Sequence, residues 1–185
     1  MAHASTQSAT KPDLRRAEIL EKLADHMLAA GLSGSSLRAM ARAVGTSDRM
    51  LLYYFRDKTE LVGATLEVIA ARLVAMMEAQ RAPEPRPYAI LVRELSTSLL
   101  NPQAWPYMRL WLELASLSAL GDPVFRAVGE QIGRGFLEWG TAQLDSPTPE
   151  ARAIEGAKLL VTIEGLALLT SIGLDDVCRT ALDAP

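Results

Sequence analysis

A short basic and aromatic segment holds the residues of this chain whose chemistry is most recognisable. It reads SDRMLLYYFRDK from position 47 to position 58, with Arg49 ahead of a run of apolar residues and Arg56 and Lys58 behind it. An arginine side chain can form two hydrogen bonds to a guanine base, worth roughly 1–3 kcal/mol of discrimination between bases. The segment is therefore suited to contact with a nucleic acid.

The rest of the sequence has no arrangement that is typical of an enzyme. It contains no acid/base constellation, no glycine-rich phosphate loop and no HExxH motif. The single cysteine, Cys178, excludes an internal disulfide, and together with His3 and His26 it forms no cluster with metal-ligand spacing. We expect neither catalysis, nor a metal, nor a cofactor.

Composition indicates an ordinary folded protein. Of the 185 residues, 49% are hydrophobic and 22% are charged, which argues against disorder. No stretch approaches the ~18 apolar residues of a membrane-spanning helix, and the N-terminal sequence lacks the apolar centre of a signal peptide. We therefore expect a cytoplasmic protein with no membrane contact.

The net charge is −3, yet the first sixty residues hold nine Lys and Arg against seven Asp and Glu. This excess of positive charge is only weak support for nucleic-acid binding, because an uneven surface charge explains it as well.

Short helices precede a long one in the first part of the chain. The predicted segments are an amphipathic helix over 13–30, a short helix that starts at Ser35 or Ser36 and ends at Gly45, a third that starts at Thr46 or Ser47, and a long helix from Lys58 to about Gln80. The third helix must be short, because Asp57 and Glu60 signal a new helix start directly after Phe55. Residues 36–55 thus have the dimensions of a helix-turn-helix, whose second helix lies in the DNA major groove. On spacing alone, there is an alternative to DNA binding: Leu51, Tyr54 and Phe55 would only fill the core, and the basic residues would only form a solvated surface.

The stretch SSLRAMARAVGTSDRMLLYYFRDKTEL, from Ser35 to Leu61, resembles the DNA-binding signature of TetR-type transcriptional regulators. The matching positions are Ser36, Met40-Ala41, Val44-Gly45, Ser47, Tyr54-Phe55, Lys58 and Leu61. The resemblance covers about 45 residues once the first helix is included. Leu52 stands where the family usually has a tyrosine, and Arg49 and Met50 stand where small residues are common.

The resemblance implies a role for each residue of the motif. Leu51, Tyr54 and Phe55 would anchor the short helix, since two turns are not stable alone in water. Ser36 and Lys58 would contact phosphate at helix starts, where free backbone N–H groups and the helix dipole favour anions. The full predicted DNA-binding set is Ser36, Thr46, Ser47, Arg49, Met50, Tyr53, Tyr54 and Lys58.

We predict an all-α protein with an N-terminal helix-turn-helix DNA-binding domain and a C-terminal helical domain for ligand binding and dimerisation. After a proline-rich break at 81–87, helices are expected at about 87–100, 102–120, 123–144, 150–172 and 174–183. The predicted domains are a disordered arm at 1–12, the DNA-binding domain at 13–60 and the ligand-binding and dimerisation domain at 61–185.

The 150–172 helix is apolar on all sides. Glu164 is its only charged residue between Leu159 and Ile172, so one face can fill its own core and another can contact a second copy. Complete burial in a monomer is the alternative. The TetR resemblance favours a homodimer, and the predicted dimerisation residues are Leu159, Ile163, Leu166 and Leu169.

Aromatic residues are concentrated in two neighbouring helices of the second domain. The predicted ligand-binding residues are Trp105, Met108, Trp111, Glu113, Phe136, Trp139 and Glu164. Four glycines in the 123–144 helix indicate either close helix packing or a cavity, and the resemblance implies a small-molecule pocket here. Glu113 and Glu164 would orient an apolar or aromatic effector, unless arginines pair with them.

These features predict a DNA-binding transcriptional regulator whose partner is a double-stranded operator. By resemblance it is a repressor that releases a palindromic operator when a small apolar or aromatic effector binds. The alternative is a helical protein–protein adaptor that keeps the helix-turn-helix only as a scaffold.

Overall fold

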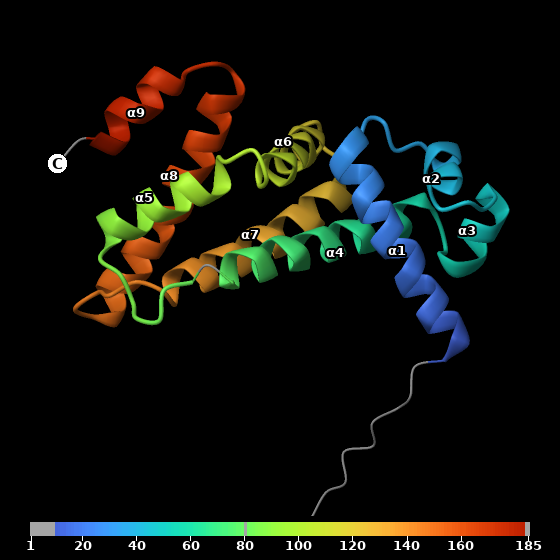
Figure 1. Ribbon diagram of the computed structural model, residues 1–185, viewed down its shortest axis with the longest axis horizontal. Coiled ribbons are helices and arrows are strands. Elements are labelled where there is room, and N and C mark those ends of the chain that lie inside the picture. The colour runs from blue at the N-terminus through green and yellow to red at the C-terminus, as the bar shows by residue number, and fades with distance from the viewer. Residues whose placement is uncertain (1–9, 80, 184–185) are drawn as a thin grey trace, which may run out of the picture. The chain divides into compact units, whose positions relative to one another are not determined.

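The computed structural model describes residues 10–79 and 81–183, and regular structure in these ranges is helical. The helices are α1 (Lys11–Ala30), α2 (Leu37–Ala43), α3 (Asp48–Tyr54), α4 (Lys58–Glu78), α5 (Tyr88–Leu99), α6 (Trp105–Ala119), α7 (Pro123–Thr141), α8 (Pro149–Ser171) and α9 (Asp175–Asp183) (Figure 1). The predicted all-α fold is confirmed. Most of the arm predicted at 1–12 lies outside the described residues. Within them, no helix has the length and apolar character that crossing a membrane requires.

The chain divides into two compact units between Val68 and Ile69. We call the unit that ends at Val68 the head and the unit that begins at Ile69 the body. The division falls inside α4, so this helix contributes residues to both units. The domain limits drawn from the sequence stay predictions.

In the head, α1 begins and ends at clear capping residues. Thr10 and Asp13 form a reciprocal capping box at its start, and Gly31 follows its last turn with a φ of 78°. The apolar side of α1 covers the short helices, and the fully buried side chains of the head include Leu23, Met27, Met40, Leu51, Phe55 and Leu61. The core therefore stabilises α2 and α3. Each has only seven residues and would not be a stable helix without this packing.

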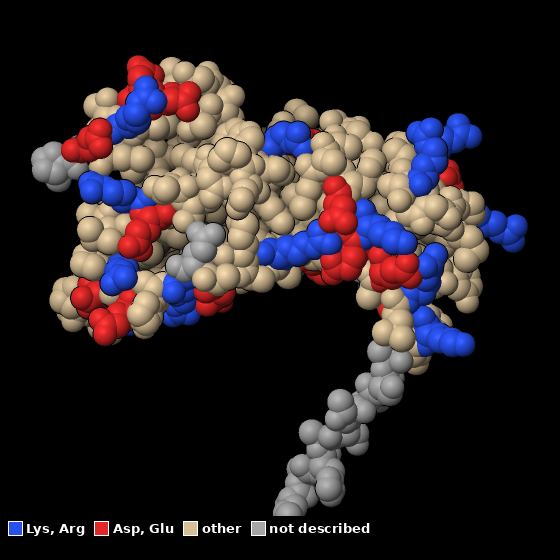
Figure 2. Space-filling model, viewed as in Figure 1, with Lys and Arg blue, Asp and Glu red and all other residues tan. Residues whose placement is uncertain are grey.

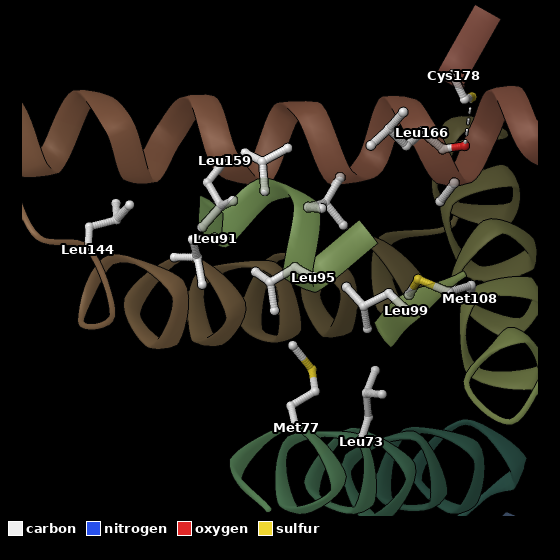
Figure 3. Close-up of a cluster of buried hydrophobic side chains, with 13 residues drawn as sticks. Leu73, Met77, Leu91, Leu95, Leu99, Met108, Leu144, Leu159, Leu166 and Cys178 are labelled. Atoms are coloured by element: carbon white, nitrogen blue, oxygen red, sulfur yellow. Dashed lines mark hydrogen bonds between the residues drawn. The ribbon is translucent and has the colours of Figure 1, made fainter. Parts of the chain in front are cut away.

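The body is built around α8, which packs against α5, α6, α7 and α9. Figure 3 shows leucine and methionine side chains from α5, α6, α8 and the last turns of α4 pointing toward one another, together with Leu144, which follows α7. Cys178 of α9 is buried, and its Sγ donates to the Leu166 carbonyl at 3.8 Å.

Close helix packing accounts for two glycines of α7. A Cβ at Gly129 would lie 2.8 Å from Leu114 of α6, and one at Gly140 would lie 3.0 Å from Leu159 of α8. Both distances are too short for an unstrained contact, so glycine lets α7 approach its neighbours. Gly135, by contrast, has no such neighbour within 4 Å.

Candidate nucleic-acid interface and effector site

The turn between α2 and α3 depends on Gly45. Its φ is 71°, a left-handed conformation that residues with a side chain rarely adopt, although there is open space around it. The Thr46 N–H donates to the Ala41 carbonyl at 2.9 Å and closes the turn. Glycine at this position is therefore required by the backbone conformation, as in a helix-turn-helix.

Capping and burial fix α3 in the head. The Ser47 hydroxyl accepts a hydrogen bond from the Met50 N–H at 3.2 Å and starts the helix. Leu51 and Phe55 are completely buried, so the predicted anchors lie in the core, while Tyr54 is half-buried. One side of α3 is thus committed to the fold, which leaves the opposite side for contact with other molecules.

That opposite side of α3 carries the residues predicted to contact DNA bases. Arg49, Met50 and Tyr53 are exposed, with Tyr53 at 74%, and Thr46 is half-buried. Positions 49, 50 and 53 lie on one face of α3, because 53 follows 49 and 50 by four and three residues, and Thr46 lies in the turn just before the helix. The Tyr54 ring stands edge-on to Tyr53 at 5.1 Å. We call Thr46, Arg49, Met50 and Tyr53 the recognition face.

Residues predicted to contact phosphate flank this face. Ser36 is exposed at the start of α2, where its oxygen accepts from the Ala39 N–H at 3.2 Å and its O–H is still able to donate. Lys58 is exposed at the start of α4. Leu52, at the position where TetR proteins usually have tyrosine, is 44% exposed but provides no hydroxyl.

Two further basic residues on α2 were missed in the sequence. Arg38 and Arg42 are exposed and lie one helical turn apart. Figure 2 shows Lys and Arg side chains protruding from the part of the head that carries α2 and α3. Two arginines spaced by four residues in the first helix of the motif would have been the signal for them.

A small network joins the end of α3 to the start of α4. Glu60 accepts from the Arg56 N–H at 2.7 Å and from the Arg16 guanidinium at 3.1 Å. The backbone hydrogen bond from Arg56 is the main cause that holds the pKa of Glu60 below its usual value; desolvation opposes it, and the contacts with Arg16 lower the pKa further. The Arg16 guanidinium also lies 4.7 Å from the centre of the Phe55 ring. Through these contacts, Glu60 connects α4 to α1 and to the residues that follow α3.

In the body, two of the predicted ligand-binding residues meet directly. The indole N–H of Trp111 on α6 donates to a carboxylate oxygen of Glu164 on α8 at 2.5 Å. Both residues are half-buried, and burial raises the pKa of Glu164 while the Trp111 hydrogen bond lowers it. Within the described part of the chain, no arginine or lysine pairs with Glu164. Pairing with arginine, the alternative considered from the sequence, does not occur there.

The remaining ligand-binding predictions fall at different places. Trp105 and Phe136 are half-buried against the body core. Met108 belongs to that core and is only 5% exposed, so it is a core residue and does not line an accessible surface. Glu113 is half-buried, but it lies two residues after Trp111 and therefore on a different side of α6.

The third tryptophan has a carboxylate partner that the sequence did not indicate. Trp139 of α7 donates its indole N–H to Glu78, near the end of α4. Glu78 also pairs with Arg81 at 3.4 Å. The two residues are 61 positions apart, so sequence spacing carried no signal for this contact.

The predicted dimerisation residues need correction. Leu159, Ile163 and Leu166 are buried in the body's own core, and Leu169 is half-buried against it. They point inward because α8 is surrounded by α5, α6, α7 and α9 on that side. The large apolar side chains that stay exposed on α8 and at its C-terminal cap are instead Ile154, Val161, Leu168 and Ile172. We call these four residues the α8 stripe.

Comparisons with known proteins agree with this geometry. No protein-family model matches the chain. The HTH-type transcriptional regulator BetI of Burkholderia thailandensis is 28% identical over 162 residues, which covers 84% of this chain and 81% of that protein. A TetR-family transcriptional regulator from Cytophaga hutchinsonii superimposes with a TM-score of 0.70 at 16% identity, covering 96% of each chain. The multidrug binding protein EbrR, solved with proflavin, superimposes with a TM-score of 0.65 at 24% identity, covering 91% of this chain and 97% of that one.

The likeness to solved structures establishes the shared fold, and the similarity to BetI extends through both the head and the body. Both agree with the resemblance carried by Ser35–Leu61. Relatives and structural neighbours of the TetR type thus support the resemblance of this chain to TetR-family transcriptional regulators.

Proposed function

We propose that this protein is a DNA-binding transcriptional repressor that binds a palindromic operator as a homodimer and releases it when a small aromatic or apolar effector binds the body. The observation that carries the proposal is the recognition face. It presents Arg49, Met50 and Tyr53 to solvent from a short helix whose other side is buried. A helix that served only as scaffold would have no need of an exposed arginine and tyrosine one turn apart.

The head separates base contact from phosphate contact. The recognition face would enter the major groove, where Arg49 can form a bidentate contact with guanine. Ser36 and Lys58, together with Arg38 and Arg42, lie on the flanking helix starts and on α2, where they would bind phosphates. Phosphate contacts position a protein on DNA, whereas base contacts give sequence preference.

A second copy of the chain is the occupant we propose for the α8 stripe. Its residues at 154, 161, 168 and 172 repeat at intervals of seven and four, so they follow one side of the helix. They are between 51% and 72% exposed. Between Leu159 and Ile172 the helix carries no charge apart from Glu164. Such a face is suited to a two-fold contact in which the same helix of each subunit packs on the other.

The effector would act through α4. This helix starts in the head, and its last turns contribute Leu73 and Met77 to the body core. Trp139 holds the end of α4 through Glu78. A ligand bound among the half-buried aromatic residues of α6 and α7 would shift that end and change the spacing of the two heads. A coupling of about 1–3 kcal/mol is enough to change the affinity for DNA markedly.

An electrophoretic mobility shift assay with the DNA upstream of the protein's own gene tests DNA binding. A shifted band that resists competition by unrelated duplex is expected, and it should depend on salt because phosphate contacts release counterions. A protein that forms a dimer yet shifts no duplex would contradict the proposal and favour the adaptor.

Tryptophan fluorescence tests the switch, because Trp105, Trp111 and Trp139 all lie in the body. Candidate aromatic ligands are titrated with and without bound operator. Since coupling is reciprocal, DNA must weaken effector binding by the factor by which the effector weakens DNA binding. A ligand that binds equally well in both titrations would show that binding and release are not linked.

A further inference from the structure

The contact between Trp111 and Glu164 bears on the charge of the effector. We infer that the body binds an organic cation with an aromatic or compact apolar frame, held beside the Glu164 carboxylate and against the face of the Trp111 ring. The inference rests on the proposed function, since it specifies the class of ligand for the same site.

Glu164 has no oppositely charged partner among the described residues. It is half-buried, it accepts a hydrogen bond from one uncharged indole N–H, and no basic side chain pairs with it there. Burial raises the pKa of its carboxyl group, which means that the surroundings disfavour the charged form. A positive charge beside it would remove this penalty, whereas a neutral or anionic ligand would not.

Trp111 supplies the second half of the site. Its N–H group is directed at the carboxylate, so the ring edge is fixed next to Glu164 while part of the ring remains accessible. The face of an indole attracts cations, and tryptophan is the most effective side chain for this interaction. An organic cation would therefore gain two interactions here, a charge pair with the carboxylate and a cation–π contact with the indole ring.

Helix α7, which packs beside Trp111, keeps several of its apolar side chains partly exposed. A Cβ at Gly133 of α7 would lie 3.8 Å from the Trp111 ring, so α6, α7 and α8 come together here. Along α7, Gly140 is the only fully buried residue, and apolar side chains such as Ile132 and Phe136 are half-buried. These side chains are partly accessible, so the apolar frame of a ligand can pack against them.

The second indole–carboxylate pair in the body is less suited to this role. Glu78, which accepts from Trp139, is exposed and already pairs with Arg81. Its charge is therefore compensated within the chain. The comparison singles out Glu164 as the carboxylate that gains most from an external cation.

The test compares two probes that share one ring system and differ in charge. N-methylquinolinium carries a permanent positive charge, and quinoline is largely neutral at neutral pH. Isothermal titration calorimetry gives the dissociation constant of each probe for the wild type, for Glu164→Gln and for Glu150→Gln. The last variant is the control, because it removes an exposed carboxylate from the same helix.

We expect the wild type and Glu150→Gln to bind N-methylquinolinium about tenfold more tightly than quinoline, equivalent to about 1.4 kcal/mol. Glu164→Gln should lose most of that preference and retain its affinity for quinoline. Equal affinities of the wild type for both probes, binding of neither probe, or an undiminished preference in Glu164→Gln would each overturn the inference. So would a Glu164→Gln variant whose change is confined to its oligomeric state in light scattering, since that result would assign the residue to the subunit contact.

These results are independent of DNA binding. If the wild type shifts operator DNA but shows no preference for the cation, this inference is wrong and the proposed function stands. If it shows the expected preference but binds no duplex, the proposed function is wrong instead.

Discussion

The head and the body use apolar and charged residues in opposite ways. In the head, Leu51 and Phe55 are completely buried, and charged side chains pair at the surface, Arg16 with Glu60 and Arg56 with Asp57. In the body, the tryptophans are half-buried, and Glu164 accepts from the Trp111 indole but has no basic partner among the residues that the structure describes.

This difference follows from what each unit has to do. A surface that fits the fixed shape of DNA benefits from rigid support, because bound side chains then lose less conformational freedom. A site that takes a small molecule needs groups whose interactions are incomplete until the ligand arrives. We therefore expect mutations in the head to act on DNA affinity and mutations in the body to act on assembly and ligand response.

The largest effect should distinguish two leucines of α8 that are two residues apart. Leu166 is 4% exposed and Leu168 is 51% exposed. Leu166→Glu buries a charge without a partner and should lower the free energy of unfolding by more than about 4 kcal/mol. Leu168→Glu should instead give a folded monomer. Thermal unfolding followed by tryptophan fluorescence, together with light scattering, separates the two outcomes.

A dimeric Leu168→Glu variant would remove the α8 stripe as the subunit contact. If both variants unfolded, the exposed and buried sides of α8 would not be distinct, and the dimer proposal would have to be moved to another surface.

The next effect concerns the core of the head. Phe55→Ala should cost about 3–5 kcal/mol, because a fully buried ring leaves a cavity. The three tryptophans lie in the body, so their unfolding transition should move less than the loss of helix measured by circular dichroism. Leu52→Ala is the control, since Leu52 is a partly exposed neighbour on the same helix. Identical shifts in both signals would mean that the head and the body unfold as one unit.

Within the head, base and phosphate contacts should be separable. Arg49→Ala should cost roughly 1–3 kcal/mol on the preferred sequence and flatten the preference at one or two base pairs. Lys58→Ala should weaken all duplexes alike and reduce the slope of log affinity against log salt by about 0.9. Fluorescence anisotropy at several salt concentrations measures both quantities.

Arg134→Ala, which removes the same charge from an exposed position on α7, is the control for these variants. The assignment fails if Arg49→Ala and Lys58→Ala both bind DNA as this control does.

The smallest effect is a pH-dependent gain in stability. Because burial raises the pKa of Glu164 in the folded protein, the folded state holds its proton to a higher pH than the unfolded chain. Charged Glu164 therefore lowers stability above its folded pKa, and this cost disappears as the pH falls toward the unfolded value. Glu164→Gln should melt slightly higher than the wild type at neutral pH, and the difference should shrink in acid. A lower melting temperature at neutral pH would show that the ionised carboxylate is a structural anchor for Trp111.

The head and the body also differ in how much of their structure and of their site residues can be predicted from the sequence. The head depends on local signals: Gly45 for the turn, Ser36 and Ser47 for the helix starts, and Asp57 for the start of α4. Each lies within a few residues of what it determines, so the helix-turn-helix and its exposed face follow from the sequence. Arg38 and Arg42 were visible in the sequence but were not recognised as part of that face.

In the body, long-range packing decides which side of a helix is buried. Because α8 is apolar on all sides, its pattern could not show that Leu159 and Leu166 face inward while Val161 and Leu168 face outward. The contacts of Trp111 with Glu164 and of Trp139 with Glu78 join residues more than fifty positions apart. Helix limits were predictable in both units, whereas these contacts required the structure.

Selection of binding sites from a random duplex library by the purified wild-type protein tests the central claim most directly. The account predicts enrichment of a palindrome whose half-sites are about 34–36 Å apart, or a multiple of that distance, because two recognition faces related by a two-fold axis must enter successive major grooves. The Arg49→Ala variant should enrich a palindrome with the same spacing but with a weaker preference at one or two positions in each half-site. A library that shows no enriched sequence, or one without two-fold symmetry, would contradict the account of a dimeric regulator that recognises DNA through α3.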